Sequence, residues 1–182
     1  EMNTTPLLAM RGIAKRFPGV VALDNVSLEV GKGEVLALCG ENGAGKSTLM
    51  KILGGVYQPD EGEVLVDGQP VKVNNVTDAM KLGIAFIHQE LNVLENLDVA
   101  ANVFLGREPL IGPFKLIDQK KIHADTEPYL KRLGLNISSK TRLDRLSIAQ
   151  QQMVEIAKAL SLNARIIIMD EPTSSLTLSE TE

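Results

Sequence analysis

Residues 40–48 constrain the fold of this chain more than any other stretch, because they read GENGAGKST and match the pattern G-x-x-x-x-G-K-[ST]. Glycines in such a loop let backbone N–H groups turn inward around phosphate oxygens. Lys46 adds a positive charge for the β- and γ-phosphates of a ligand, and Ser47 offers a hydroxyl to Mg²⁺. The residues predicted to bind the phosphates are Gly40, Glu41, Asn42, Gly43, Ala44, Gly45, Lys46, Ser47 and Thr48.

The sequence on both sides of this loop supports the prediction. The apolar, β-prone run at residues 34–39 comes directly before it and is typical of a buried parallel strand. Residues 46–53 then predict a short helix, which Gly54 and Gly55 end. The positive N-terminus of that helix would point at the bound anion. Cys39 lies in the predicted strand, so we expect a buried and unreactive thiol.

Composition narrows the class of protein. The chain has 182 residues, of which 44% are hydrophobic and 23% charged, as expected for one globular domain with a substantial core. The net charge of −4 gives no support for nucleic-acid binding. The single cysteine excludes an intramolecular disulfide and fits a reducing compartment. No apolar run approaches the roughly 18 residues of a transmembrane helix.

The remaining elements are predicted from hydrophobic periodicity and from turn residues. Predicted strands cover residues 7–13, 20–30, 63–66, 71–73, 84–87 and 165–169, the last two as buried strands. Predicted helices cover residues 77–82, 118–133 and 147–160. Asp118 is the expected N-cap of the second helix, and Pro128 is expected to kink or divide it. Ser147 and Gln150 are expected to form a capping box at the start of the third.

A second group of candidate site residues follows the last predicted strand. A hydrophobic strand that ends in an acid places its carboxylate at the edge of a parallel sheet where ligands bind. Asp170 there could hold the Mg²⁺ shell, in part through water. Glu171 suits a general base that polarises an attacking water molecule. The alternative is an ordinary strand end at the surface, capped by two acidic residues.

Five motifs in this order resemble the ATP-hydrolysing subunit of ABC transporters. They are the loop at 40–48, Gln89 after a predicted strand, the sequence LSIAQ at 146–150, the pair Asp170 and Glu171, and the sequence PTSSL at 172–176. The resemblance implies an α/β P-loop NTPase with a RecA-like, mostly parallel sheet, an antiparallel β subdomain and a helical subdomain. It implies a single nucleotide-binding domain over 1–182, with the core at 1–90 and 161–182 and the helical part at 91–160.

The resemblance also implies roles for residues outside the loop. Phe17 would stack on the adenine of ATP, although it could instead be a plain apolar anchor. Gln89 would reach Mg²⁺ and the attacking water, and would act in catalysis together with Lys46 and Glu171. A lone glutamine is otherwise an ordinary polar loop residue.

The resemblance also implies which residues bind Mg²⁺ and what the sequence LSIAQ does. Ser47, Gln89 and Asp170 would contribute to the Mg²⁺ site. Ser147 and Gln150 would contact the nucleotide held by an opposite module, although Ser147 could serve mainly as an N-cap.

The sequence departs from the family pattern at three points. Ile148 and Ala149 stand where the signature motif has glycines, so the closest backbone approach to a nucleotide is lost. Thr177 stands where an aspartate is usual. The family's switch histidine and the last strands of the core are expected downstream of residue 182. We therefore expect the 182-residue chain alone to bind ATP·Mg²⁺ weakly or not at all and to hydrolyse it poorly.

A subfamily is indicated by the sequences HQELN at 88–92 and NVFLGRE at 102–108, which look like those of bacterial monosaccharide importers of the ribose, galactose and xylose type. That resemblance implies ATP-driven sugar import at the cytoplasmic face of the inner membrane. Its partners would be a second ATPase module, membrane permease subunits and, indirectly, a periplasmic sugar-binding protein, with no nucleic acid. The alternatives are a soluble ABC ATPase of DNA repair or translation, and a nucleotide-gated module without efficient turnover.

Overall fold

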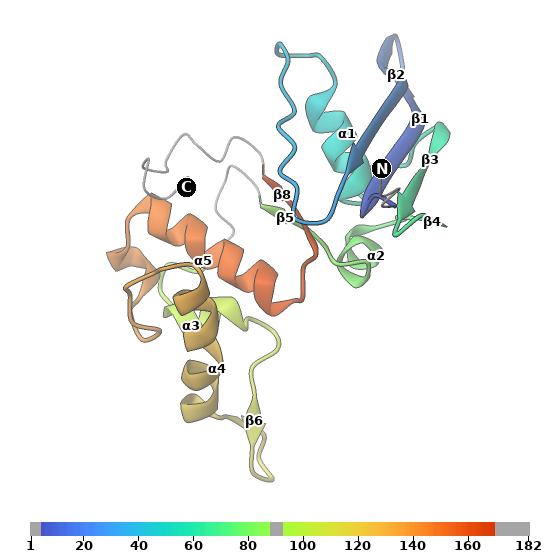
Figure 1. Ribbon diagram of the computed structural model, residues 1–182. Helices are drawn as coiled ribbons and strands as arrows, with labels where there is room; N and C mark the ends of the chain where they lie inside the picture. The colour runs from blue at the N-terminus through green and yellow to red at the C-terminus, as the bar shows by residue number, and fades with distance from the viewer. Residues whose placement is uncertain (1–4, 88–92, 170–182) are drawn as a thin grey trace. The chain divides into compact units, whose positions relative to one another are not determined.

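The computed structural model describes residues 5–87 and 93–169, and the chain forms two compact units, Glu1–Ile84 and Ala85–Glu182. The first unit is built on a four-stranded antiparallel sheet in the order β2-β1-β3-β4 (Figure 1). Its strands are β1 (Leu8–Phe17), β2 (Val20–Val30), β3 (Glu61–Val66) and β4 (Gln69–Val71). The predicted strands at 7–13, 20–30 and 63–66 are therefore confirmed.

The hairpin between β3 and β4 differs from the prediction by two residues. Asp67 and Gly68 both have positive φ values, 50° and 77°. Such a two-residue turn matches the twist of the flanking strands and places Val66 directly opposite Gln69. The partner strand therefore lies at Gln69–Val71 and not at 71–73.

Helix α1 (Lys46–Leu53) begins and ends where the sequence predicts. Its buried face carries Leu49, Ile52 and Leu53, and the first unit also buries Leu8, Met10 and Ile13 of β1. Gly55 after the helix has φ +76°, and a Cβ there would lie 2.3 Å from the carbonyl oxygen of Asn75. The asparagine side chain itself caps α2 (Val76–Lys81), because its Oδ1 accepts from Asp78 N at 2.9 Å.

The prediction of a buried strand at residues 34–39 is wrong. This segment has no strand structure, Val35 is 95% exposed, and Cys39 is an exposed free cysteine. A strand buried on both faces needs hydrogen-bonded neighbours on both sides, and the described strands of the first unit do not pair with it. The expectation of a buried Cys39 thiol is therefore corrected too.

The second unit is mainly helical. It contains α3 (Val99–Val103), α4 (Gln119–Arg132), the 3₁₀ turn η1 (Leu143–Arg145) and α5 (Ile148–Ser161). These elements share one apolar core, whose fully buried members are Val99, Val103, Leu130, Leu143, Val154 and Ala157. The predicted helices at 118–133 and 147–160 are confirmed, with Asp118 as the N-cap of α4.

The sequence predicts that Pro128 kinks or divides α4, but the helix is not divided. The helix continues from Gln119 to Arg132 with the proline inside it. Pro128 is exposed, while Ile122, Thr126 and Leu130 on the same helix are buried. A proline ring in a helix removes one backbone hydrogen bond, and the packing of the buried face outweighs that loss.

Short strands complete the second unit, the first of them beginning at Ile84, the last residue of the first unit. Strands β5 (Ile84–Ile87) and β8 (Ile166–Met169) pair with each other, while β6 (Leu110–Ile111) and β7 (Leu116–Ile117) form a hairpin that the sequence analysis missed. Strand β8 is less buried than predicted, since only Ile168 is fully buried and Met169 is 39% exposed. Among the described residues β8 has one neighbouring strand, which covers a single edge.

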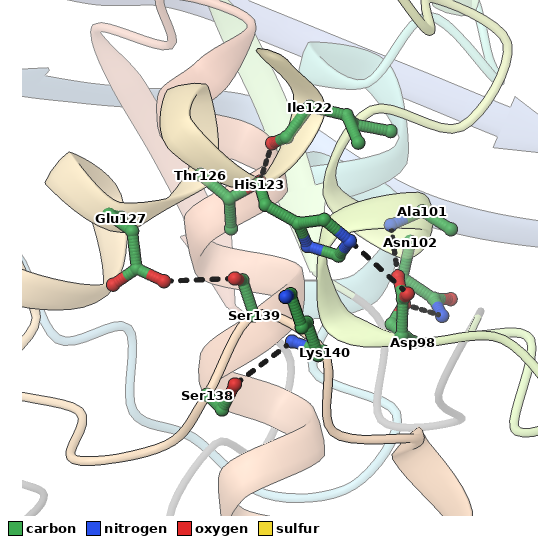
Figure 2. A network of polar contacts seen from close by, with 10 residues as sticks. All are labelled: Asp98, Ala101, Asn102, Ile122, His123, Thr126, Glu127, Ser138, Ser139 and Lys140. Atoms are coloured by element: carbon green, nitrogen blue, oxygen red, sulfur yellow. Dashed lines mark hydrogen bonds and ion pairs between the residues drawn. The ribbon is translucent and has the colours of Figure 1, made fainter. Parts of the chain in front are cut away.

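A polar network joins α3, α4 and the segment after α4 (Figure 2). Asp98 caps α3, because its Oδ1 accepts from Ala101 N at 2.8 Å. The other carboxylate oxygen of Asp98 lies 3.9 Å from His123 Nε2 on α4. On the same helix, Glu127 accepts a 2.9 Å hydrogen bond from the buried hydroxyl of Ser139. These contacts fix the start of α3 against α4.

Two residues of the sequence NVFLGRE at 102–108 have structural partners within this unit. The buried amide of Asn102 bonds both the N–H and the carbonyl oxygen of Leu94, at 2.8 and 3.0 Å. Arg107 Nη2 donates to Val103 O and to Ser161 Oγ, each at 2.8 Å, and so ties the end of α3 to the end of α5.

Within residues 5–87 and 93–169, no helix combines the length and the apolar character needed to cross a bilayer.

Candidate functional site

The loop at 40–48 has the backbone shape that its glycines predict. Gly43 and Gly45 have φ values of +85° and +91°, a region that residues with a side chain rarely occupy. Gly45 also packs closely on β2, because a Cβ there would lie 2.5 Å from Ala22 O and 2.8 Å from Leu23 Cδ2. Gly45 therefore fixes the end of the loop against the sheet.

Lys46 folds back over the loop. Its Nζ donates hydrogen bonds to the carbonyl oxygens of Gly40 at 2.5 Å and Glu41 at 2.8 Å. The same turn is closed by Ala44 N, which donates to Glu41 O at 3.2 Å. The ammonium group is thus held by the loop whose N–H groups would bind phosphate oxygens.

The start of α1 differs from the other described α-helices of the chain. Side chains cap α2, α3, α4 and α5, whereas the N-cap of α1 is Gly45, which makes no side-chain cap hydrogen bond. The first backbone bond of the helix runs from Leu49 N to Gly45 O at 3.0 Å, and Ser47 is exposed. The first-turn N–H groups and the Ser47 hydroxyl can therefore receive an anion and its metal ion.

Phe17 lies at the end of β1, directly opposite Val20 at the start of β2. Its half-buried ring meets the Tyr57 ring edge to face, with centroids 5.3 Å apart and planes at 69°. Ala22, against which Gly45 packs, lies two residues after Val20. The β1–β2 hairpin therefore carries Phe17 and supports the loop within the same unit.

Tyr57 is a candidate that the sequence analysis did not identify. The chain has only four Phe and two Tyr and no Trp, so an aromatic residue shortly after the phosphate-loop helix was a usable signal. The pairing with Phe17 joins residues 40 positions apart, and no local pattern predicts such a contact.

Ser147 and Gln150 lie in the second unit and form the predicted capping box at the start of α5. Gln150 N donates to Ser147 Oγ at 3.2 Å, and Ser147 N donates to Gln150 Oε1 at 3.0 Å. Ile148 between them is 62% exposed. Gln151 is buried and donates to Leu143 O at 2.9 Å. The two predicted ligand residues thus serve as a helix cap within the chain.

The other predicted site residues, Gln89, Asp170 and Glu171, lie outside the described residues, as does the sequence at 172–176. In the part of the chain that the structure describes, no group of three or more His, Cys, Asp or Glu side chains could hold a metal ion. Of the three residues predicted to contribute to the Mg²⁺ site, Ser47 is the one that lies among the described residues.

The fold and the loop define a P-loop nucleotide-binding protein, and comparison with known proteins names the family. The family model described as "ABC transporter" matches residues 23–174. The chain belongs to this family. Its predicted fold class is confirmed by a crystal structure of the ADP conformation of MJ1267, an ATP-binding cassette of an ABC transporter. That likeness has a TM-score of 0.83 at 28% identity and covers 98% of this chain and 73% of the other. A nucleotide-free cassette has a TM-score of 0.81 at 29% identity, with 97% and 73% covered.

Curated relatives are closer in sequence. A putative ribose/galactose/methyl galactoside import ATP-binding protein of Burkholderia ambifaria is 59% identical over 96% of this chain and 34% of its own length. The ribose import ATP-binding protein RbsA 1 of Streptomyces avermitilis is 54% identical, with 99% and 34% covered. The galactose/methyl galactoside import protein MglA 1 of Photobacterium profundum is 52% identical, with 97% and 35% covered. The chain thus spans about a third of the length of these relatives.

Proposed function

We propose that this chain binds ATP as part of an ATPase that energises monosaccharide import, and that the loop at 40–48 holds the phosphates. The observation that carries the proposal is the loop itself. Gly45 fixes it on β2, Lys46 is held over it, and the helix behind it has no side-chain cap. The import proteins named above, at 52 to 59% identity, support sugar import over DNA repair or translation.

Binding of a triphosphate would replace the carbonyl partners of Lys46. The ammonium group would leave Gly40 O and Glu41 O and contact phosphate oxygens, while N–H groups of the loop and of the first turn of α1 donate to the same anion. The exposed Ser47 hydroxyl fits a hard cation that prefers oxygen ligands. Together with Gln89 and Asp170 it would hold Mg²⁺, which neutralises charge on the phosphates when bound.

Hydrolysis requires a group that accepts a proton from water. We assign this role to Glu171, with Gln89 orienting the water and Lys46 stabilising the charge on the phosphates. Phe17 supplies a stacking face for adenine. Ser147 and Gln150 would act on the nucleotide of an opposite module, with their helix-start N–H groups available to its γ-phosphate.

We propose the domain organisation and the partners on the same basis. The chain would be one nucleotide-binding domain, with its core at 1–90 and 161–182 and its helical part at 91–160. It would work with a second ATPase module and with membrane permease subunits at the cytoplasmic face of the inner membrane. A periplasmic binding protein would deliver the sugar. The curated relatives are about three times as long as this chain, which leaves room for a second module on one polypeptide.

Two substitutions in the full-length polypeptide test the proposal. Lys46→Ala should weaken binding of a fluorescent ATP analogue, because the loop loses its cation. Glu171→Gln should keep binding and lower phosphate release by at least about 10²-fold, the usual contribution of a general base. Lys32→Ala, an exposed lysine in the turn after β2, is the matched control and should change neither. Unchanged turnover in Glu171→Gln would remove this residue from its role.

A further inference from the structure

We propose that Tyr57 is a positioning residue for the nucleotide base, which holds the Phe17 ring in place and links it to the phosphate-loop helix. This inference rests on the proposed ATP site and adds a residue to it. Tyr57 lies four residues beyond the end of α1 and outside the motifs that define the site.

The ring contact is the first observation. The Phe17 and Tyr57 rings meet edge to face, with centroids 5.3 Å apart and planes at 69°. This geometry is favoured because the positive edge of one ring faces the negative face of the other. Phe17 is only half buried at the end of a strand, where the Tyr57 ring and the Lys15 ammonium group lie against its ring. A ring fixed in advance loses less conformational entropy when a base stacks on it.

The second observation links Tyr57 to the phosphate loop. The N–H groups of Val56 and Tyr57 donate to the carbonyl oxygen of Lys51 at 2.8 and 3.2 Å. The Lys51 ammonium group also lies 5.7 Å from the Tyr57 ring centroid, within cation–π range. Lys51 is on α1, five residues after Lys46. Tyr57 therefore connects the helix that receives the phosphates to the ring that would receive the base.

The backbone under Phe17 is held separately. Asp60 accepts hydrogen bonds from Lys15 Nζ at 2.8 Å and from Arg16 N at 2.7 Å. Asp60 N donates in turn to Ala14 O at 2.9 Å. These bonds fix the backbone at the end of β1, and the Lys15 Nζ that Asp60 holds also lies 5.6 Å from the Phe17 ring centroid. Loss of the Tyr57 ring should therefore loosen the Phe17 side chain while the strand stays in place.

The test compares ligands with and without a base. The affinities of the full-length polypeptide for ATP and for inorganic tripolyphosphate are measured by calorimetry. Tyr57→Ala and Tyr57→Leu should weaken ATP binding about two- to tenfold, the range for one aromatic pair, and leave tripolyphosphate binding unchanged. Tyr57→Phe keeps the ring and should bind ATP as the parent does. Tyr129→Ala removes the ring paired with Phe104 in the other unit and is the matched control, with both affinities unchanged.

A double substitution separates positioning from direct contact. If Tyr57 acts through Phe17, adding Tyr57→Ala to Phe17→Ala should cause no further loss of ATP affinity. Additive losses would show that Tyr57 touches the base itself and would overturn the positioning role. Equal weakening of ATP and tripolyphosphate, or no change in either, would also overturn it. A parent protein that binds neither ligand would refute the ATP site itself, and the inference with it.

Discussion

Replacing Gly45 by alanine tests whether the end of the phosphate loop must be a glycine for two separate reasons. The first reason is backbone conformation, because Gly45 has φ +91°. Holding a residue with a Cβ in a left-handed conformation costs about 1–2 kcal/mol. The second reason is space, because the new Cβ would lie 2.5 Å from the Ala22 carbonyl oxygen. That oxygen belongs to the backbone of β2 and cannot rotate away.

Gly43 separates the two reasons. It has φ +85°, yet a Cβ there would meet nothing within 4 Å. Gly43→Ala should therefore lower the free energy of unfolding by the conformational cost alone, about 1–2 kcal/mol. Gly45→Ala adds an overpacking cost of about 1–3 kcal/mol and should reach about 2–5 kcal/mol in total. The difference between the variants measures how tightly the loop packs on the sheet.

Urea unfolding followed by circular dichroism measures both variants, and binding of a fluorescent ATP analogue follows the loop itself. We expect Gly45→Ala to lose more stability and more affinity than Gly43→Ala, because its loop must move away from β2. Equal losses in the two variants would show that Ala22 yields without cost. A Gly45→Ala protein with parental stability would refute both parts of the argument.

Three further predictions concern single contacts. Asp98→Ala should lower the free energy of unfolding by about 0.5–2 kcal/mol in thermal or urea melts, because α3 loses its N-cap, and Asp98→Asn should retain most of it. The hydrogen bond from Lys15, with a second from the Arg16 N–H, lowers the pKa of Asp60 below its ordinary 3.8. This contribution to stability is present above pH 3.8 and is lost as the pH falls through the lowered pKa, so acid titration of Asp60→Asn should show a smaller loss there. Ser147→Asp retains a residue that caps α5 and should leave melting unchanged, but it should lower ATP turnover in the full-length protein, because Ser147 is proposed to act on the nucleotide of an opposite module. Unchanged turnover would leave Ser147 only its role as a cap.

The sequence predicted those helices and strands whose ends are marked by local residues such as caps and turn glycines. Strand β2 has alternating apolar residues followed by a glycine turn, and α5 has a capping box, so both were located closely. Residues 34–39 were misread because their burial depends on neighbouring strands and not on their own apolar character. The two-residue strands β6 and β7 are too short for any periodicity to indicate.

The candidate site likewise has parts that the sequence predicted and parts that depend on tertiary packing. The loop at 40–48 was readable because its chemistry is contiguous in sequence, and its glycines have the φ values that the motif requires. The contact between Phe17 and Tyr57 was not readable, because it depends on how β1 packs beside the segment after α1. The bonds between Ser147 and Gln150 were predictable, by contrast, because a capping box is a local sequence pattern.

The two carbonyl bonds of Lys46 have a consequence for affinity. The Lys46 ammonium group already donates hydrogen bonds to Gly40 O and Glu41 O within the loop. In the proposed ATP site a phosphate would have to exchange with these oxygens, so the affinity for ATP would reflect the difference between two sets of contacts to one cation. A variant that weakened the internal set without touching the ligand would bind ATP more tightly. The carbonyl oxygens of Gly40 and Glu41 thus compete with the phosphates of the nucleotide for the Lys46 ammonium group.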